Sequence, residues 1–134
     1  MNILFLTIAY PEETSRNIYS DLMQEFCYRG HKVYVLCSLE RRLGSTTRYS
    51  KESEIMVLRQ WTLNLTKTNI IEKGLGTVLI EWQFINAIKK NLADVKFDLV
   101  LYSTPPITFD KAISFLRERD SCATYLLLKD IFPQ

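Results

Sequence analysis

The residues best suited to chemistry follow apolar segments of the chain. Residues 122–128, CATYLLL, predict a buried strand, and Lys129 and Asp130 come directly after it. A carboxylate at a strand end can act as a general base or bind a sugar hydroxyl, and a neighbouring lysine favours its ionised form. Asp130 is therefore the candidate catalytic residue, and Lys129 is a candidate substrate contact. The alternative is that both are solvated residues of a loose terminus.

A second candidate is the loop STPPIT, residues 103–108, which begins at the last residue of the predicted strand 98–103. Pro105 and Pro106 stiffen it, because each proline fixes its own backbone angle and restricts the residue before it. Rigid loops suit the binding of a small ligand, so Thr104 and Pro105 are candidate substrate-binding residues. The alternative is a simple turn in which Thr108 is the N-cap of a helix that starts at Phe109.

A third candidate is the loop after the first apolar run, Ile3–Ile8. It contains no glycine between positions 8 and 17, and the chain has no Walker A motif. The GLG at 74–76 follows no strand and lacks a third glycine, which argues against ordinary NAD, FAD or ATP binding. The polar residues of this loop are candidate acceptor-binding or substrate-binding residues: Thr14, Ser15, Arg16 and Asn17. Arg16, near a predicted helix N-terminus, is either a phosphate contact or a solvated arginine.

Metal-dependent and hydrolase chemistry find no support in the sequence. His31 is the only histidine, and Cys27, Cys37 and Cys122 form no C-x-x-C pair. This is not a metal-ligand pattern, and reduced thiols are the simplest interpretation. No G-x-S-x-G motif is present. We therefore expect no metal site and no cofactor held by this chain.

Composition limits the class of protein. The chain has 134 residues, 47% hydrophobic and 24% charged, which fits a single globular domain over 1–134. A net charge of +2 does not indicate a nucleic-acid binder. The apolar start lacks the basic segment and cleavage site of a signal peptide, and no run approaches the ~18 apolar residues that span a bilayer. These features favour a cytoplasmic protein.

Strand and helix patterns alternate along the chain. Predicted strands cover Ile3–Ile8, 33–38, 55–61, 98–103 and 122–128, with helices from about Asn17 to a cap at Gly30, from about Thr77, and from Phe109. The pattern predicts an α/β fold with an open, mostly parallel, Rossmann-like sheet of about five strands and helices on both faces. With strand order 3-2-1-4-5, ligands would bind at the carboxyl ends of strands one and four.

Two segments are less regular. Residues 39–54 are polar and predict a long loop. In the segment 62–82, Ile71, Leu75, Val78 and Trp82 form one apolar stripe that continues to Ile85. We interpret the stripe mainly as core packing, although with its tryptophan and two lysines the segment is also suited to touching a membrane surface.

The residues resemble a known family. MNILFLTIAYPEETSRNIYSDLMQEFCYRGHKVYVL is similar to the opening of retaining glycosyltransferases of the GT-B fold, family 4. FDLVLYSTPPITF and TYLLLKDIFPQ resemble the subgroup that builds capsule, O-antigen and exopolysaccharide chains. One departure is that PEETSRN stands where many relatives carry a Gly-Gly pair.

The resemblance implies two Rossmann-like domains that face each other across a cleft, of which this chain is the N-terminal, acceptor-side one. The expected reaction is metal-free transfer of a sugar from a nucleotide-sugar to a saccharide or lipid-linked acceptor, with retained configuration. Because the 134 residues contain no E-x7-E motif, we expect the donor-binding domain to be absent from this chain. We therefore expect the chain alone to be inactive, and expect peripheral contact with the inner membrane face.

Two alternatives remain open. The chain could be a complete small Rossmann-like module that binds a nucleotide or a protein without catalysis. It could also be the acceptor-side subunit of a transferase whose donor-binding half is a separate polypeptide.

Overall fold

The computed structural model describes residues 1–64, 68–103 and 109–127 of the chain. Strands, helices and one short 3-10 helix (η1) follow one another as β1 (Asn2–Thr7), α1 (Ile18–Tyr28), β2 (Lys32–Glu40), η1 (Arg41–Leu43), β3 (Arg48–Glu52), β4 (Ile55–Thr62), α2 (Ile70–Asn91), β5 (Leu99–Ser103), α3 (Asp110–Asp120) and β6 (Ala123–Leu127). The predicted α/β alternation is confirmed, and Gly30 ends the α1 segment with a positive φ of 89°.

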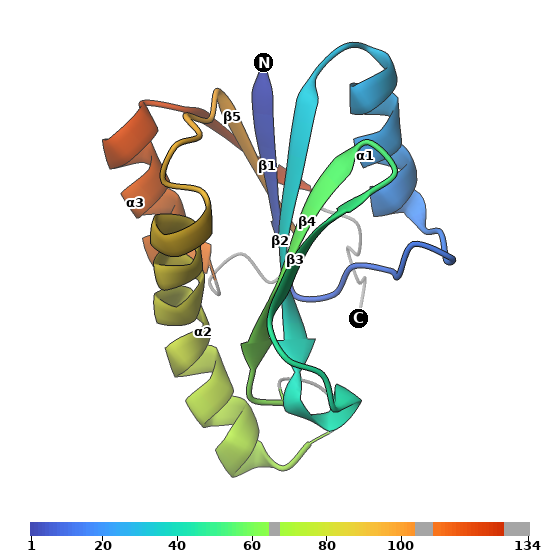
Figure 1. Cartoon of the computed structure of the whole chain (residues 1–134). Helices are drawn as coiled ribbons and strands as arrows, with labels where there is room; N and C mark the ends of the chain where they lie inside the picture. Colours follow the sequence, from blue (N-terminus) through green and yellow to red (C-terminus); the bar gives the residue numbers. More distant parts are fainter. Residues whose placement is uncertain (65–67, 104–108, 128–134) are drawn as a thin grey trace, which may run out of the picture.

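The sheet has the order β3-β4-β2-β1-β5-β6 (Figure 1). All neighbours are parallel except β3, which pairs antiparallel with β4. The predicted order 3-2-1-4-5 is therefore confirmed for the parallel strands. Strand order reverses at β1, because the chain moves from β1 toward β2 and β4 and later returns to β5 and β6.

Helices cover both faces of the sheet, as predicted. Helix α1 lies on one side, and α2 and α3 lie together on the other (Figure 1). Right-handed crossovers explain this, because α1 and the two later helices connect strands in opposite directions along the sheet. Each face has its own core: Phe5, Val35 and Met23 pack on the α1 side, and Leu6, Leu36 and Phe84 pack on the other.

The prediction of a long loop over 39–54 was wrong in part. Strand β2 continues to Glu40, η1 follows, and Arg48–Glu52 form the edge strand β3. The β3 sequence, RYSKE, shows no buried apolar alternation because the strand lies at the edge of the sheet, where its residues are exposed or half-buried. Its pairing with β4 is what makes it a strand.

Helix α2 begins at Ile70 and not near Thr77. The side chain of Asn69 caps it by accepting a hydrogen bond of 2.8 Å from the Glu72 amide. Gly74 and Gly76 therefore lie within the helix, where their low helix propensity does not prevent its formation. Gly76 is buried, so its lack of a side chain suits the packed face of α2.

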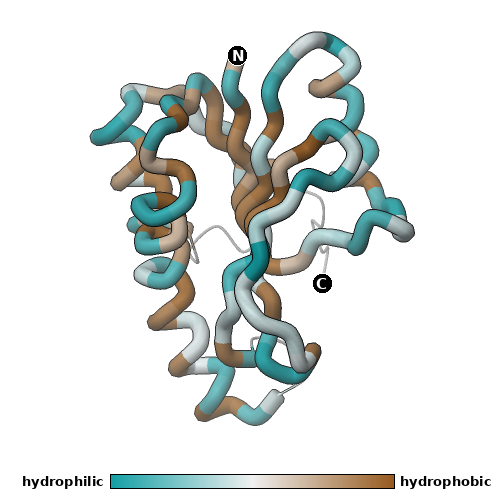
Figure 2. The backbone as a smooth tube through the Cα atoms, viewed as in Figure 1, coloured by the Kyte–Doolittle hydropathy of each residue, from teal (hydrophilic) through white to brown (hydrophobic). Residues whose placement is uncertain are grey.

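The interpretation of the α2 stripe as core was wrong from Ile71 to Trp82, although Ile85, at the end of the predicted stripe, packs against the core. Ile71, Leu75, Val78 and Trp82 are 74, 55, 75 and 67% exposed. The buried face of α2 is a different set, Gly76, Ile80, Phe84, Ala87 and Ile88. The helix therefore has two apolar faces, and hydrophobic residues continue along its outer side (Figure 2). Within the described residues, no helix is both long and apolar enough to cross a bilayer.

Candidate functional site

The carboxyl edge of the sheet at β1 and β5 is the place where this topology puts a ligand. Thr7 ends β1 and Ser103 ends β5, and both are 3% exposed. The hydroxyl of Ser103 donates a hydrogen bond of 2.9 Å to Thr7 Oγ1, and the Thr7 hydroxyl donates to the Ala9 carbonyl at 3.1 Å. This hydroxyl pair joins the two strands below the loop that follows β1.

That loop, residues 8–16, is here called the first loop. Its start is fixed from β2, because the Ile8 carbonyl accepts two hydrogen bonds from Ser38, at 2.6 Å from Oγ and 3.2 Å from the amide. The first loop therefore leaves the sheet edge in a defined direction, although it contains no glycine to allow a tight turn.

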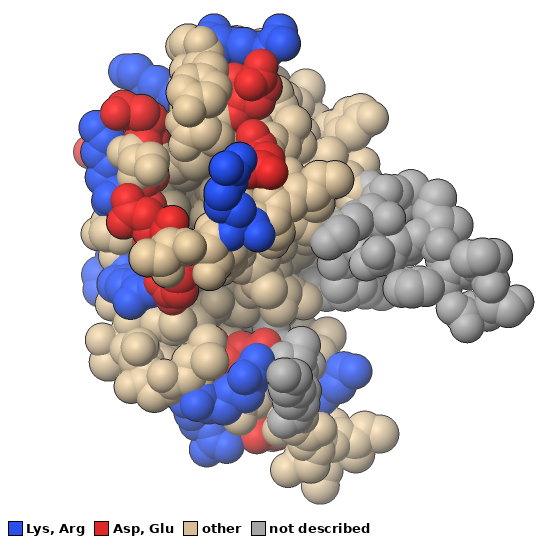
Figure 3. All heavy atoms as spheres, turned by 90° about the vertical axis from the view of Figure 1, so that its right-hand side faces the viewer, with Lys and Arg blue, Asp and Glu red and all other residues tan. Residues whose placement is uncertain are grey.

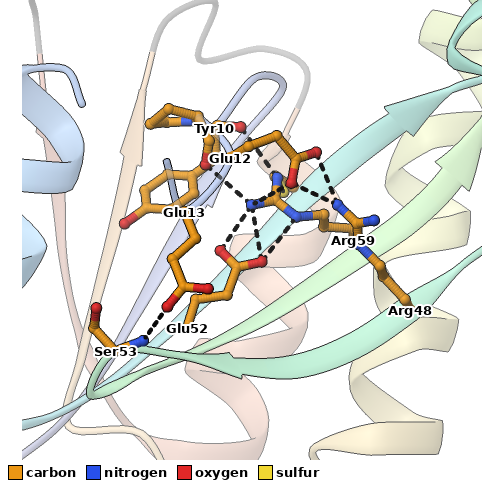
Figure 4. Close-up of polar contacts among 9 residues, drawn as sticks. Tyr10, Glu12, Glu13, Arg48, Glu52, Ser53 and Arg59 are labelled. Atoms are coloured by element: carbon orange, nitrogen blue, oxygen red, sulfur yellow. Dashed lines mark hydrogen bonds and ion pairs between the residues drawn. The ribbon is translucent and has the colours of Figure 1, made fainter. Parts of the chain in front are cut away.

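Arg59 of β4 holds the next part of the first loop (Figure 4). Its guanidinium is 3% exposed and donates to the carbonyls of Tyr10 at 3.1 Å and Pro11 at 3.0 Å. It also pairs with the Glu52 carboxylate of β3, at 2.9 and 3.2 Å, and lies 3.8 Å from Cys37 Sγ. One buried cation thus connects the first loop to β2, β3 and β4.

Two glutamates extend this attachment (Figure 4). Both carboxylate oxygens of Glu12 accept hydrogen bonds from Arg48, at 2.7 and 2.8 Å, and Glu13 accepts one of 3.1 Å from the Ser53 amide. Burial is the main cause that raises the pKa of the Tyr10 hydroxyl, so this group stays protonated. The loop is therefore pre-organised by polar contacts to the β3–β4 hairpin.

A pocket of about 690 Å³ lies beside the first loop, between α1 and the β3–β4 hairpin. It does not lie over the junction of β1 and β5, so it is a lateral pocket and not the ligand site that the topology predicts. Six carboxylate residues and one arginine are among its lining residues: Glu12, Glu13, Asp21, Glu25, Glu52, Glu54 and Arg16. The face that carries α1 shows acidic and basic side chains interspersed (Figure 3).

The carboxylates of this lateral pocket are engaged. Glu12 and Glu52 pair with Arg48 and Arg59, and Asp21 pairs with Arg16 at 2.7 Å. A diphosphate would meet mostly negative charge here, whereas sugar hydroxyls could donate to the carboxylate oxygens. No group of three His, Cys, Asp or Glu residues within the described parts is placed to hold a metal ion.

The candidate residues 14–17, of which three end the first loop and Asn17 follows it, lie in three different environments. Thr14 is exposed, and Ser15 donates its amide to the Glu12 carbonyl at 2.8 Å within a turn. Arg16 and Ser15 both line the lateral pocket. Asn17 is the N-cap of α1: its side chain accepts from the Ser20 amide at 2.9 Å, and the Ser20 hydroxyl accepts from the Asn17 amide.

The other predicted site residues lie outside the described residues: Thr104, Pro105, Lys129 and Asp130, together with the predicted N-cap Thr108. The sequence positions that flank them are described, and Ser103 and Leu127 are paired in register as neighbours on β5 and β6. The last described residues of β5 and β6 are therefore neighbours at one edge of the sheet, which is the adjacency expected from the order 3-2-1-4-5.

Sequence reasoning missed Thr7, Ser103, Arg59 and Glu52. Thr7 and Ser103 could have been found as the polar residues that end apolar strands. Arg59 carried a signal too, since it is the charged residue inside the apolar segment IMVLRQW. Glu52 had no such signal, because its partner is specified only by the antiparallel β3–β4 pairing.

Comparison with known proteins agrees with this architecture. A scan against protein-family models finds no match. A search of curated protein sequences finds no relative. Among solved structures, one from E. coli, described as trehalose-6-phosphate bound with UDP-2-fluoro glucose, matches with a TM-score of 0.66 and 8% sequence identity. The match covers 99% of this chain and 34% of the other, so the chain spans about a third of that protein's length.

The similar structure is a glycosyltransferase of the GT-B fold. The match therefore defines the fold of this chain, which is an α/β domain with a mostly parallel, Rossmann-like sheet of the GT-B kind. The likeness does not extend to family 4 or to the capsule subgroup that the sequence resembles.

Proposed function

We propose that this chain forms the N-terminal, acceptor-side domain of a retaining GT-B glycosyltransferase. In the proposed reaction a sugar passes from a nucleotide-sugar to a saccharide or lipid-linked acceptor during cell-surface polysaccharide synthesis. The observation that carries the proposal is the fold match, which covers nearly the whole chain and part of a larger sugar-nucleotide-bound GT-B protein. The family 4 sequence pattern at the two ends of the chain supports the finer assignment.

The site of the proposed reaction is the carboxyl edge of β1 and β5. The Thr7–Ser103 hydroxyl pair forms its base, and the first loop, held by Arg59, forms one wall. The segments 104–108 and 128–134 follow neighbouring strands at the same edge. In the proposal, Asp130 and Lys129 contact the acceptor together with Thr104 and Pro105. The donor nucleotide-sugar is held mainly by a second Rossmann-like domain, with no metal ion.

The single test is a transfer assay with two forms of the protein. The 134-residue chain alone is assayed for UDP-sugar binding by calorimetry and for hydrolysis. A protein that joins this chain to a donor-binding domain in one polypeptide is assayed for transfer of radiolabelled sugar to membrane-extracted lipid. We expect transfer only from the joined protein. Hydrolysis or nanomolar UDP-sugar affinity from the chain alone contradicts the proposal and favours an independent nucleotide-binding module.

The alternative of a two-chain transferase has its own outcome in this assay. The donor-binding domain, added as a separate polypeptide, would then restore transfer to the level of the joined protein. Under the main proposal, the two separate pieces give much less transfer, because a linker supplies the effective concentration that brings the halves together.

A further inference from the structure

Helix α2, with 22 residues, is twice as long as its neighbour α3, with 11. The Lys111 amide at the start of α3 donates to Glu81 at 3.2 Å, and further along Lys89 lies over the Phe115 ring at 5.3 Å. The part of α2 before Glu81 extends beyond α3 (Figure 1). From its start to Trp82, six large apolar side chains are at least 40% exposed: Ile70, Ile71, Leu75, Val78, Leu79 and Trp82. Such a contiguous apolar surface marks a contact site, because exposed hydrophobic residues otherwise occur singly.

Four of these residues form a row, which we call the α2 seam. They recur at spacings of four, three and four, the repeat with which one helix packs along another. The members of the seam are Ile71, Leu75, Val78 and Trp82. Ile85 continues the repeat but packs against the core, and the next position, Lys89, contacts α3. The α2 seam is therefore about 16 Å long and lies mainly on the part of the helix that α3 leaves uncovered.

The α2 seam carries no charge, and the charged residues nearest to it are engaged or point elsewhere. Glu72 pairs with Arg41 at 2.8 Å, and its side chain is only 14% exposed. Lys73 comes seven residues before Ile80, so the helical repeat places it on the side that packs on the sheet. Glu81 accepts its hydrogen bond from the start of α3. A second copy of the chain therefore meets the seam without opposing like charges.

We propose that the α2 seam binds the α2 seam of a second copy of this chain, with the two helices antiparallel about a two-fold axis. A two-fold interface joins the same patch on both copies, so each residue must find its complement within the patch itself. An antiparallel pair centred between positions 76 and 77 satisfies this condition. Ile71 then lies against Trp82 of the second copy, and Leu75 lies against Val78 of the second copy. Both contacts occur twice, once on each side of the axis.

The pairing also matches a large side chain with open space. Gly74 lies beside Ile71 and Leu75 on the helix surface, and a Cβ atom placed on it meets no atom within 4 Å. This space receives the Trp82 indole of the second copy, as ridges of one helix pack into grooves of another. The six exposed side chains offer about 500 Å² per copy, or about 1,000 Å² for the pair, near the lower bound for a specific interface. We therefore expect a reversible dimer with a micromolar dissociation constant.

The test is sedimentation equilibrium of the 134-residue chain at about 1 to 200 µM, a range that brackets the dissociation constant expected for an interface of this size. We expect the mean mass to rise from that of one chain to nearly that of two. No donor-binding domain and no sugar is added. The result is therefore independent of the proposed transferase reaction, and the two can hold or fail separately.

Substitutions on the seam should abolish the dimer. Val78→Ser with Trp82→Ser should raise the dissociation constant by about 100-fold or more, because two apolar contacts are lost on each copy. The matched control is Tyr28→Ser, a large residue 78% exposed on α1, which should leave the dissociation constant unchanged. All three substitutions are at exposed positions, and circular dichroism should confirm an unchanged fold.

Disulfide cross-linking tests the antiparallel register. Val78→Cys is made in a Cys27→Ser/Cys122→Ser background, in which the remaining native thiol, Cys37, is buried. The proposed pairing brings the two copies of residue 78 close enough for a disulfide, which needs Cα atoms within about 7 Å. The two copies of residue 71 lie about 16 Å apart along the antiparallel helices. Oxidation should therefore link most of the Val78→Cys protein and little of an Ile71→Cys protein.

Three results overturn the inference. The first is a chain that stays monomeric up to about 200 µM, which would assign the α2 seam to a different partner. The second is a dimer whose dissociation constant is the same in the Val78→Ser/Trp82→Ser variant. The third is equal cross-linking of the Val78→Cys and Ile71→Cys proteins, which is the result expected for parallel helices.

Discussion

The guanidinium of Arg59 on β4 and the carboxylate of Glu52 on β3 form a buried ion pair at 2.9 Å, with side chains 3 and 13% exposed. The same guanidinium donates to the Tyr10 and Pro11 carbonyls, so one ion pair both closes the β3–β4 hairpin and fixes the first loop. Since the loop borders the proposed reaction site, the geometry of that site depends on a residue that no ligand would touch.

Removing this arginine should be strongly destabilising. We expect Arg59→Met to lower the free energy of unfolding by about 3–5 kcal/mol, because Glu52 is left as an unpaired, largely buried charge. The control is Arg48→Met: Arg48 pairs with Glu12, but both side chains are about half exposed, so a loss of about 0–1 kcal/mol is expected. Urea unfolding measures both values. Equal losses of unfolding free energy in the two variants would show that burial does not increase the contribution of the Arg59–Glu52 pair to stability.

The hydroxyl pair at the sheet edge should respond asymmetrically to mutation. Thr7→Val removes the acceptor of the buried Ser103 hydroxyl and should lower stability by about 1–3 kcal/mol. Ser103→Ala leaves the Thr7 hydroxyl bonded to the Ala9 carbonyl and should lower it by about 0.5–1.5 kcal/mol. Urea unfolding of the two variants checks the order. If Ser103→Ala is the more damaging change, the donor directions are reversed.

Asn17 should act as a helix cap. Asn17→Ala removes the acceptor for the Ser20 amide and should lower stability by about 1 kcal/mol, whereas Asn17→Ser keeps a capping oxygen and should be close to neutral. Arg16→Gln, at an exposed ion pair with Asp21, is the neighbouring control and should change stability little. Thermal unfolding gives all three values. An unchanged melting temperature for Asn17→Ala contradicts the capping role.

The three cysteines should differ in reactivity. Burial raises the pKa of the Cys37 thiol to about 12, so at pH 8 it should react with iodoacetamide only when the protein opens. Burial also raises the pKa values of Cys27 and Cys122, but these thiols are half-buried, and their labelling should increase as the pH rises from 7 to 9 and thiolate forms. Peptide mass spectrometry follows each site. Cys37 labelling as fast as that of Cys27 would contradict its burial.

Asp130 remains the predicted catalytic residue. In a protein that joins this chain to a donor-binding domain, Asp130→Asn should reduce transfer by about 10²–10⁴-fold with little change in melting temperature. The control is Asp94→Asn, an exposed carboxylate near the opposite end of β5. Asp130 is structural, and the assignment fails, if the melting temperature falls sharply while activity per folded molecule is unchanged.

The sequence patterns predicted the parallel part of the fold well. Short apolar runs such as Ile3–Ile8 are typical of strands covered on both faces, and their alternation with helices leaves few possible sheet orders. Helix boundaries were harder to predict. Glycines at 74 and 76 suggested a late start for α2, but the Asn69 cap and tertiary packing outweigh their low helix propensity.

Features that depend on contacts between residues far apart in the sequence could not be predicted from local sequence patterns. The α2 stripe at 71–82 has a helical period, yet period alone does not say which of two apolar faces packs on the sheet. The Arg59–Glu52 pair depends on the antiparallel register of β3, and RYSKE carries no strand pattern of its own. The loops that follow β1 and β5 could be placed at one edge of the sheet, but the hydrogen bond between Thr7 and Ser103 at the two strand ends could not be predicted.

Strand β3 has a further consequence for how the protein behaves at high concentration. It is five residues long, carries Arg48 and Lys51, and covers the hydrogen-bonding edge of the apolar strand β4. Short, charged edge strands oppose strand addition from neighbouring molecules, because cationic side chains repel and few backbone groups are offered. The segment that looked like a polar loop therefore protects the sheet on that side against aggregation.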